Sequence, residues 1–207
     1  MPAPFYLYGN AKKKLQDGSI DLDTDTLKVA LTTSSYSPNL DTHDFFDDVT
    51  NEVSGTGYTS GGATLGSKTL TLTAANSWST TWAAATAYAV GDVVRPTSGN
   101  GHLYMCVVAG TSHASTEPTW PTTSRLTVTD NSSVTWAEIG TNIVVFDAAD
   151  PSWASSTITA RYGVLYKSTG TGSTSPLIGY WDFGSNITST NGTFTVVISA
   201  NGIYFLA

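Results

Sequence analysis

Ile143–Phe183, IVVFDAADPSWASSTITARYGVLYKSTGTGSTSPLIGYWDF, is the stretch that decides the fold. It contains a short apolar run at Ile143–Phe146, a run rich in β-branched and aromatic residues at Thr157–Lys167, and an alternating run at Leu177–Phe183. Alternation is typical of a half-buried strand, because successive side chains of a strand point to opposite faces of its sheet. The Ser, Thr and Gly residues of Ser168–Ser175 are typical of a loop. The stretch therefore predicts three strands, against which the rest of the chain can be placed.

The composition favours an all-β protein with many turns. Of the 207 residues only 12% are charged and 11% are aromatic, and Gly, Ser and Thr are abundant. A chain of this length can bury the core of one domain or of two small ones. The net charge of −7 argues against binding to nucleic acid, since a phosphate backbone is held by clustered Lys and Arg. We interpret the one such cluster, Lys12–Lys14, as the solvated face of a helix.

The N-terminal segment predicts an extended arm followed by a short helix. Pro2 and Pro4 disfavour a helix over Pro2–Tyr8, and Ala11–Gln16 has a helical composition. The charges follow the apolar residues, which is the wrong order for a secretory signal. No run approaches the roughly 20 apolar residues of a membrane span, so we expect no membrane partner and folding in a cytoplasm.

Two strand-like runs bracket a change in sequence character. Lys68–Thr73 alternates, and Asn142–Phe146 resumes the strand pattern after an aromatic-rich interval. We predict that they form a hairpin with a second domain inserted at its tip, because loop tips tolerate insertions. The expected domains are residues 1–75 with 142–207, an antiparallel β-sandwich or barrel-like unit, and residues 76–141, a small all-β unit. Near the C-terminus, Asn191-Gly192 and Asn201-Gly202 predict two hairpin turns.

A long polar passage, Ser34–Gly66, precedes the first of these runs. Loops of this length are often functional or form interfaces. We expect Phe45 and Phe46 to anchor it to this domain or to a neighbouring subunit. His43 lies beside several acidic residues, but a lone His without a second one at ligand spacing does not predict an enzyme or metal site.

No motif in the chain predicts catalysis. Phosphate-binding loops, nucleophile elbows and reactive Cys–His pairs are not found, and the single cysteine, Cys106, lies in an apolar run typical of a buried thiol. Asp21-Leu22-Asp23-Thr24-Asp25 starts like a calcium loop, but the later glycine and glutamate of that loop are missing. We expect no enzyme activity, no cofactor and no bound metal.

Two sets of residues resemble a family of small structural proteins of tailed bacteriophages. The first set lies in Asp25–Leu65 and includes Tyr36, Phe46, Gly57-Tyr58 and Gly61-Gly62. The second runs from Thr157 to Gly184. Several such proteins are understood as capsid decoration or cement proteins, so the resemblance implies a virion protein made in the host bacterial cytoplasm.

The expected interval 76–141 resembles a different module, the small carbohydrate-binding modules of the chitin-binding kind. The resemblance lies in Trp82, Ala87-Tyr88, Gly91-Asp92, Tyr104, Ala109-Gly110 and Glu117-Pro118 with Trp120. It implies a possible glycan platform of aromatic side chains, Trp82, Tyr88, Tyr104 and Trp120. A core role for these aromatic side chains is the alternative.

The leading functional prediction is a homotrimer that decorates and stabilises the outer capsid surface. Its partners are then the major capsid protein and other copies of itself, bound through arms and loops that symmetry repeats. We expect the contacts to come from Pro4, Phe5, Tyr6, Tyr8, Phe45 and Phe46. The alternative is a tail- or fibre-associated adhesion protein whose inserted domain binds host surface glycans.

Overall fold

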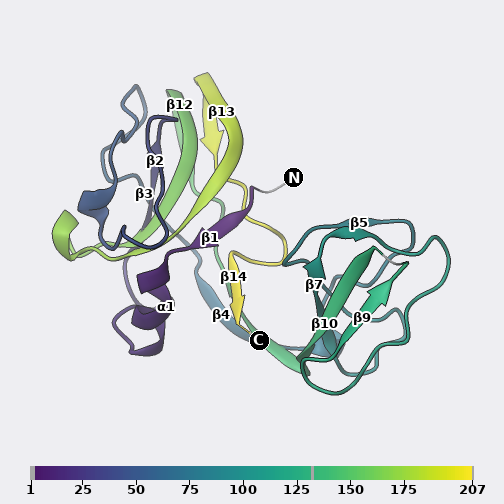
Figure 1. The fold of residues 1–207 in the computed structure, drawn as a ribbon. Coiled ribbons are helices and arrows are strands. Elements are labelled where there is room, and N and C mark those ends of the chain that lie inside the picture. The colour runs from purple at the N-terminus through teal and green to yellow at the C-terminus, as the bar shows by residue number, and fades with distance from the viewer. Residues whose placement is uncertain (1–2, 132, 207) are drawn as a thin grey trace. The chain divides into compact units, whose positions relative to one another are not determined.

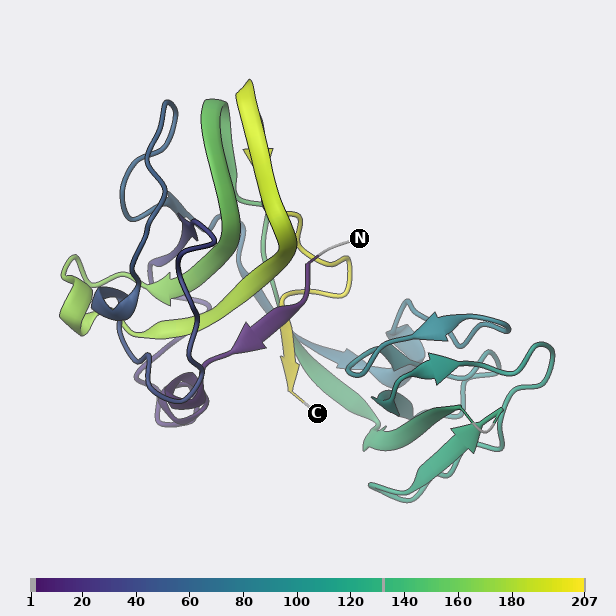
Figure 2. The ribbon, with the colours of Figure 1, turned by 45° about the horizontal axis from the view of Figure 1, so that its top comes forward.

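The computed structural model describes residues 3–131 and 133–206, and Pro2 of the expected arm lies outside them. The prediction of an all-β chain is confirmed, with 44% of the chain in strands and 8% in helices. The chain divides into two compact units (Figures 1 and 2). The first unit comprises Met1–Leu70 and Phe146–Tyr204, and the second comprises Thr71–Val145 and Phe205–Ala207. The sequence placed these limits at 75/76 and 141/142, a few residues inside the observed second unit.

A five-stranded antiparallel sheet forms the first unit. Its order is β1-β13-β12-β2-β3, and its strands are β1 Phe5–Leu7, β13 Leu177–Thr195, β12 Ser152–Lys167, β2 Leu27–Thr32 and β3 Ala63–Thr64. The arm is therefore a strand of this sheet. Helix α1, Gly9–Gln16, follows β1 directly, and short 3-10 turns lie at η1 Phe46–Asp48 and η3 Gly172–Thr174.

Both faces of this sheet carry clusters of buried apolar residues. One face packs Leu27, Leu31, Leu165, Trp181 and their neighbours against residues of the segment that follows β13, such as Ile198. The other face packs a smaller cluster that includes Tyr8, Tyr36 and Val164. The near-continuous apolar character of Leu27–Thr32 follows from this burial on both sides.

The predicted turn at Asn191-Gly192 is wrong. β13 continues through both residues, paired with β12 from Ser152↔Thr195 to Tyr166↔Leu177. Asn191 has φ 48°, and the pairing register shifts between Ser156 and Ile158 of β12, opposite this site. The left-handed conformation therefore serves a β-bulge, which requires the same backbone geometry as the expected turn. At Asn201-Gly202 a turn is present, and the Gly202 backbone N–H donates to the Ser199 carbonyl at 2.8 Å. The predicted hairpin is nevertheless wrong, because the strand that follows, Tyr204–Leu206, lies beside Asn142–Asp147 and not beside β13.

Three strands, β4 Thr69–Ala74, β11 Asn142–Asp147 and β14 Tyr204–Leu206, form a separate sheet in the order β14-β11-β4. The neighbouring positions of β4 and β11 agree with the expected pairing of Lys68–Thr73 and Asn142–Phe146. The short turn η2 Ala75–Ser77 follows β4 and leads into the rest of the second unit.

The second unit has two further small sheets. One has the order β6-β7-β10-β9, with strands β6 Val93–Val94, β7 Leu103–Val108, β10 Val134–Gly140 and β9 Thr127–Asp130. The other pairs β5 Ala87–Tyr88 with β8 Gly110–Thr111. Trp136 and Cys106 are buried in the core of this unit. Among the described residues, no helix is long and apolar enough to cross a membrane.

Candidate contact surface

Three tyrosines from three strands of the first unit form a row, which we call the tyrosine row: Tyr6 of β1, Tyr180 of β13 and Tyr162 of β12. The pairing of β1 with β13 sets Tyr6 opposite Tyr180, and their rings stack with centroids 5.2 Å apart. The Tyr162 ring meets that of Tyr180 edge-on at 5.9 Å. Tyr6 is 41% exposed and the other two are half-buried. The row is thus a partly exposed aromatic strip fixed on a sheet.

Buried hydroxyl groups support this row from below. The ring centroids of Tyr8 and Tyr180 are 5.7 Å apart, and the Tyr8 hydroxyl lies 2.9 Å from the Tyr36 hydroxyl. The Tyr36 hydroxyl also lies 3.0 Å from Nδ1 of His43. Burial raises the pKa of Tyr36 to about 12, and burial also raises that of Tyr8. The expectation that Tyr8 contacts a partner is therefore wrong, because its side chain is fully buried in its own unit.

An ion pair lies beside the row. The guanidinium of Arg161 binds the carboxylate of Asp182 and lies over the Tyr162 ring, 5.0 Å from its centroid. The N–H of Gly184 also donates to Asp182, at 2.7 Å. These contacts hold the Arg161 guanidinium over an aromatic ring, an arrangement in which Arg combines charge with cation–π contact.

The two phenylalanines of the long loop serve their own unit. The Phe46 ring stacks on Tyr166 with centroids 4.1 Å apart, and the Lys14 ammonium lies 4.0 Å from the centre of the Phe45 ring. Asp48 caps this turn by accepting from the N–H groups of Asp44 and Phe45, and these backbone hydrogen bonds lower the pKa of Asp48. Of the two anchoring roles expected, contact within the domain is the one that the structure shows. Of the remaining expected contact residues, Pro4 is exposed and Phe5 packs on Trp181 at 4.8 Å.

The remainder of the loop is held by Glu52, one of the acidic residues that cluster in this passage. Its carboxylate accepts from the Tyr58 hydroxyl at 2.7 Å, the Ser60 hydroxyl at 2.8 Å and the Gly61 N–H at 2.5 Å.

A Cβ at Gly62, which has φ 72°, would lie 1.8 Å from the Val29 carbonyl oxygen. The paired glycines are the sequence signal for this close backbone approach.

The expected glycan platform is largely part of the core of the second unit. Trp82, Tyr88 and Tyr104 are buried, so they cannot stack on a sugar in this structure. Trp120 is half-buried, packs on Tyr104 at 4.3 Å and donates from Nε1 to Glu117 at 3.0 Å. Only Trp120 among the four presents part of its ring to solvent.

A histidine–carboxylate pair also lies in the second unit. His102 Nδ1 is 2.7 Å from Oε1 of the buried Glu138. Within the described chain, Glu138 Oε2 and Trp136 Nε1 are buried without a hydrogen-bond partner. No set of three or more His, Cys, Asp or Glu placed to hold a metal occurs in residues 3–131 and 133–206.

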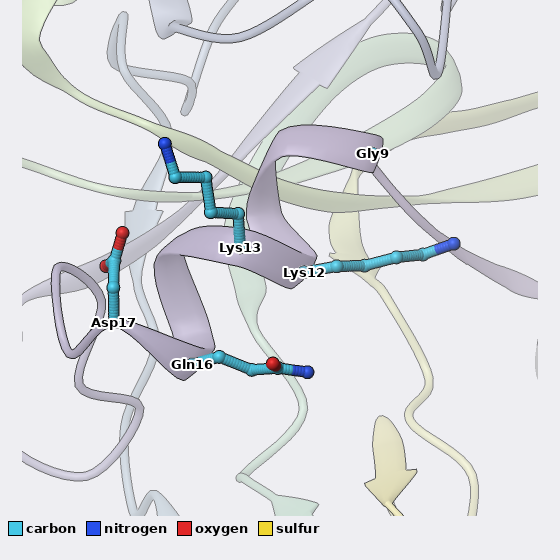
Figure 3. A pocket seen from close by; sticks show the side chains of 5 residues that line it. All are labelled: Gly9, Lys12, Lys13, Gln16 and Asp17. Carbon is cyan, nitrogen blue, oxygen red and sulfur yellow. The ribbon is translucent and has the colours of Figure 1, made fainter.

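A shallow hollow lies beside helix α1, lined by Gly9, Lys12, Lys13, Gln16 and Asp17. In Figure 3 the side chains of Lys12 and Gln16 extend to one side of the helix, and those of Lys13 and Asp17 extend to the other. Because they do not converge on a common point, the hollow offers no arrangement for holding a ligand. These side chains instead belong to the solvated face that we expected for the helix.

We compared the chain with known proteins and found no relative. No family model, no curated protein and no solved structure matches the chain. The resemblances to phage structural proteins and to carbohydrate-binding modules therefore stay predictions from the sequence.

Proposed function

We propose that this chain is a structural protein of a tailed-phage virion that decorates and stabilises the outer capsid surface. The observation that carries the proposal is the tyrosine row with its neighbouring Arg161. Tyr and Arg are the residue types in which binding energy at protein interfaces concentrates. The resemblance to phage structural proteins supplies the partner, the major capsid protein.

The construction of the row suits a lasting contact between proteins. Tyr6 stacks on Tyr180, which rests on the buried Tyr8. Rings held in this way lose little conformational freedom on binding, so more of the contact energy appears as affinity. Repetition of the surface in a homotrimer then multiplies a modest contact at each site. The inserted unit, in this proposal, is displayed outward from the capsid.

Substitution of the row tests the proposal better than removal of the arm, since the arm carries the core residue Tyr8. The Tyr6→Ala/Tyr180→Ala variant is expected to bind capsids assembled without this protein at least about 100-fold more weakly. The control is Ile187→Ala, because Ile187 is 44% exposed and lies further along β13. Undiminished occupancy of capsids by the double variant contradicts the proposed contact surface.

Labelling the protein in intact particles by electron microscopy tests its position. Label over the head supports decoration, whereas label at the tail favours the alternative, an adhesion protein. The observation that favours this second function is the rigid, half-buried indole of Trp120. It predicts that the full chain binds a polysaccharide and that Trp120→Ala abolishes binding, and a folded chain that ignores a glycan panel rejects it.

A further inference from the structure

We infer that β4 is a self-association edge, at which two copies of this chain pair through antiparallel β4 strands about a two-fold axis. The inference does not rest on the proposed function, because the homotrimer proposed there forms on the capsid, whereas this pairing joins free chains in solution. β4 lies at the end of the order β14-β11-β4, so within the described chain one of its sides has no neighbouring strand. The N–H and C=O groups that alternate along such a side can receive another strand.

β4 is also the least protected of the sheet edges. The edge strands β1, β3, β6 and β14 have two or three residues each, whereas β4 has six. Short length and charged residues are the usual protection of an edge against pairing. The sequence of β4, TLTLTA, contains no charge. β9, which lies at the edge of the four-stranded sheet opposite β6, has four residues and ends on Asp130.

Apolar side chains lie exposed on one face of β4. Leu70 is 47% and Leu72 is 66% exposed, and their spacing of two places them on the same face of the strand. Exposed leucines in sequence positions i and i+2 form a small strip, and exposed apolar strips often mark contact sites. Pairing with a second strand covers this strip and satisfies the backbone groups together.

The sequence of the strand identifies a second copy as the occupant. Thr69–Thr73 reads TLTLT in both directions, so it is a palindrome centred on Thr71. In an antiparallel pair centred there, Leu70 lies directly opposite Leu72 of the partner subunit, and Thr69 opposite Thr73 of the partner subunit. Directly opposite residues lie on the same face of a sheet, with Cβ atoms about 5 Å apart. The contact is therefore isologous, as a closed dimer requires.

Analytical ultracentrifugation of the full chain tests the dimer. We expect a reversible monomer–dimer equilibrium, which Leu72→Lys weakens at least about 100-fold because two leucines leave the contact and two charges enter it. Val90→Lys is the matched control, since Val90 is also 66% exposed but lies outside β4, between β5 and β6. Unchanged circular dichroism of each variant shows that it is folded.

A charge-exchange pair tests the register. In Leu70→Glu/Leu72→Lys, each introduced glutamate faces an introduced lysine across the antiparallel pair, so dimerisation returns. In Leu70→Lys/Leu72→Lys it does not. A wild-type chain that is monomeric at every soluble concentration overturns the inference. So does a dimer or trimer unaffected by Leu72→Lys, or a folded glutamate–lysine variant that associates no better than the lysine–lysine variant. None of these results bears on capsid binding through the tyrosine row.

Discussion

In the first unit, Tyr6, Tyr180 and Tyr162 lie in a row that reaches solvent, whereas in the second unit Trp82, Tyr104 and Trp136 lie in the core. Both groups of aromatic residues look alike in sequence. The two groups differ in what lies beneath them. The row packs on a buried layer that contains Tyr8, whereas the aromatic side chains of the second unit themselves form the core of that unit. Aromatic content therefore indicates a binding surface only where other residues already supply the core.

The largest expected effect is the loss of a core indole in the second unit. Trp136→Ala removes a fully buried ring that contacts Tyr88 and Trp120, so it destabilises that unit by about 3–5 kcal/mol. Calorimetry should show a lower unfolding temperature for this unit alone. If a single transition shared by both units moves to a lower temperature, the two units unfold together and the expectation is contradicted.

The next effect concerns the loop in the first unit. Gly62→Ala places a Cβ against the Val29 carbonyl at a positive φ, so we expect a loss of about 3 kcal/mol in the free energy of unfolding. Gly66→Ala is the control, because a Cβ there meets no described atom within 4 Å. Urea unfolding measures both, and equal stability of the two variants contradicts the close approach of loop and β2.

Alkaline pH should act on the buried layer under the row. Burial raises the pKa of Tyr36 to about 12, above the ordinary value of 10.0. The unfolded chain therefore loses this proton before the folded chain does. The stabilisation that this raised pKa contributes is fully present below pH 10 and is lost as the pH rises through about 12, with a cost of about 3 kcal/mol. Denaturant titrations across this range measure the loss, and Tyr36→Phe should remove part of the pH dependence.

The smallest effect on stability is expected in the row itself. Tyr6→Ala removes a side chain that is 41% exposed, so the free energy of unfolding should fall by only about 0.5–1 kcal/mol. Capsid binding, by contrast, should weaken clearly. A loss of several kcal/mol in thermal unfolding shows instead that Tyr6 is a core residue like Trp136, and the contrast between the units then disappears.

Local pattern predicted much of the fold. The strands at Thr157–Lys167 and Leu177–Phe183 lie within β12 and β13, and the runs on either side of the insertion lie in β4 and β11. The turn predicted at Asn191-Gly192 was wrong because a positive φ fits a bulge as well as a turn. The strands that were predicted correctly depend on residues that lie close together in the sequence.

The candidate surface was harder to predict because it depends on pairing between distant segments. Only the register Tyr6↔Tyr180 reveals that the arm is a strand and which of its side chains face solvent. The burial of Tyr8 and the role of Glu52 depend in the same way on a loop that folds back on the sheet. Alternation within β10, where Val134, Trp136 and Glu138 are buried, did carry a local signal for the core position of Trp136.

The pairing of β1 with β13 also has a consequence for biosynthesis. During translation Phe5 leaves the ribosome long before Trp181, its partner in the sheet. Until Trp181 has been synthesised, β1 has no strand to pair with. Most of the inserted unit can already form its own short-range strand pairings by that time. Sheets that close over such sequence separations fold slowly and expose unpaired edges meanwhile. We therefore expect the nascent chain to depend on chaperones up to the synthesis of its last long strand, and to gain protease resistance first in the insertion.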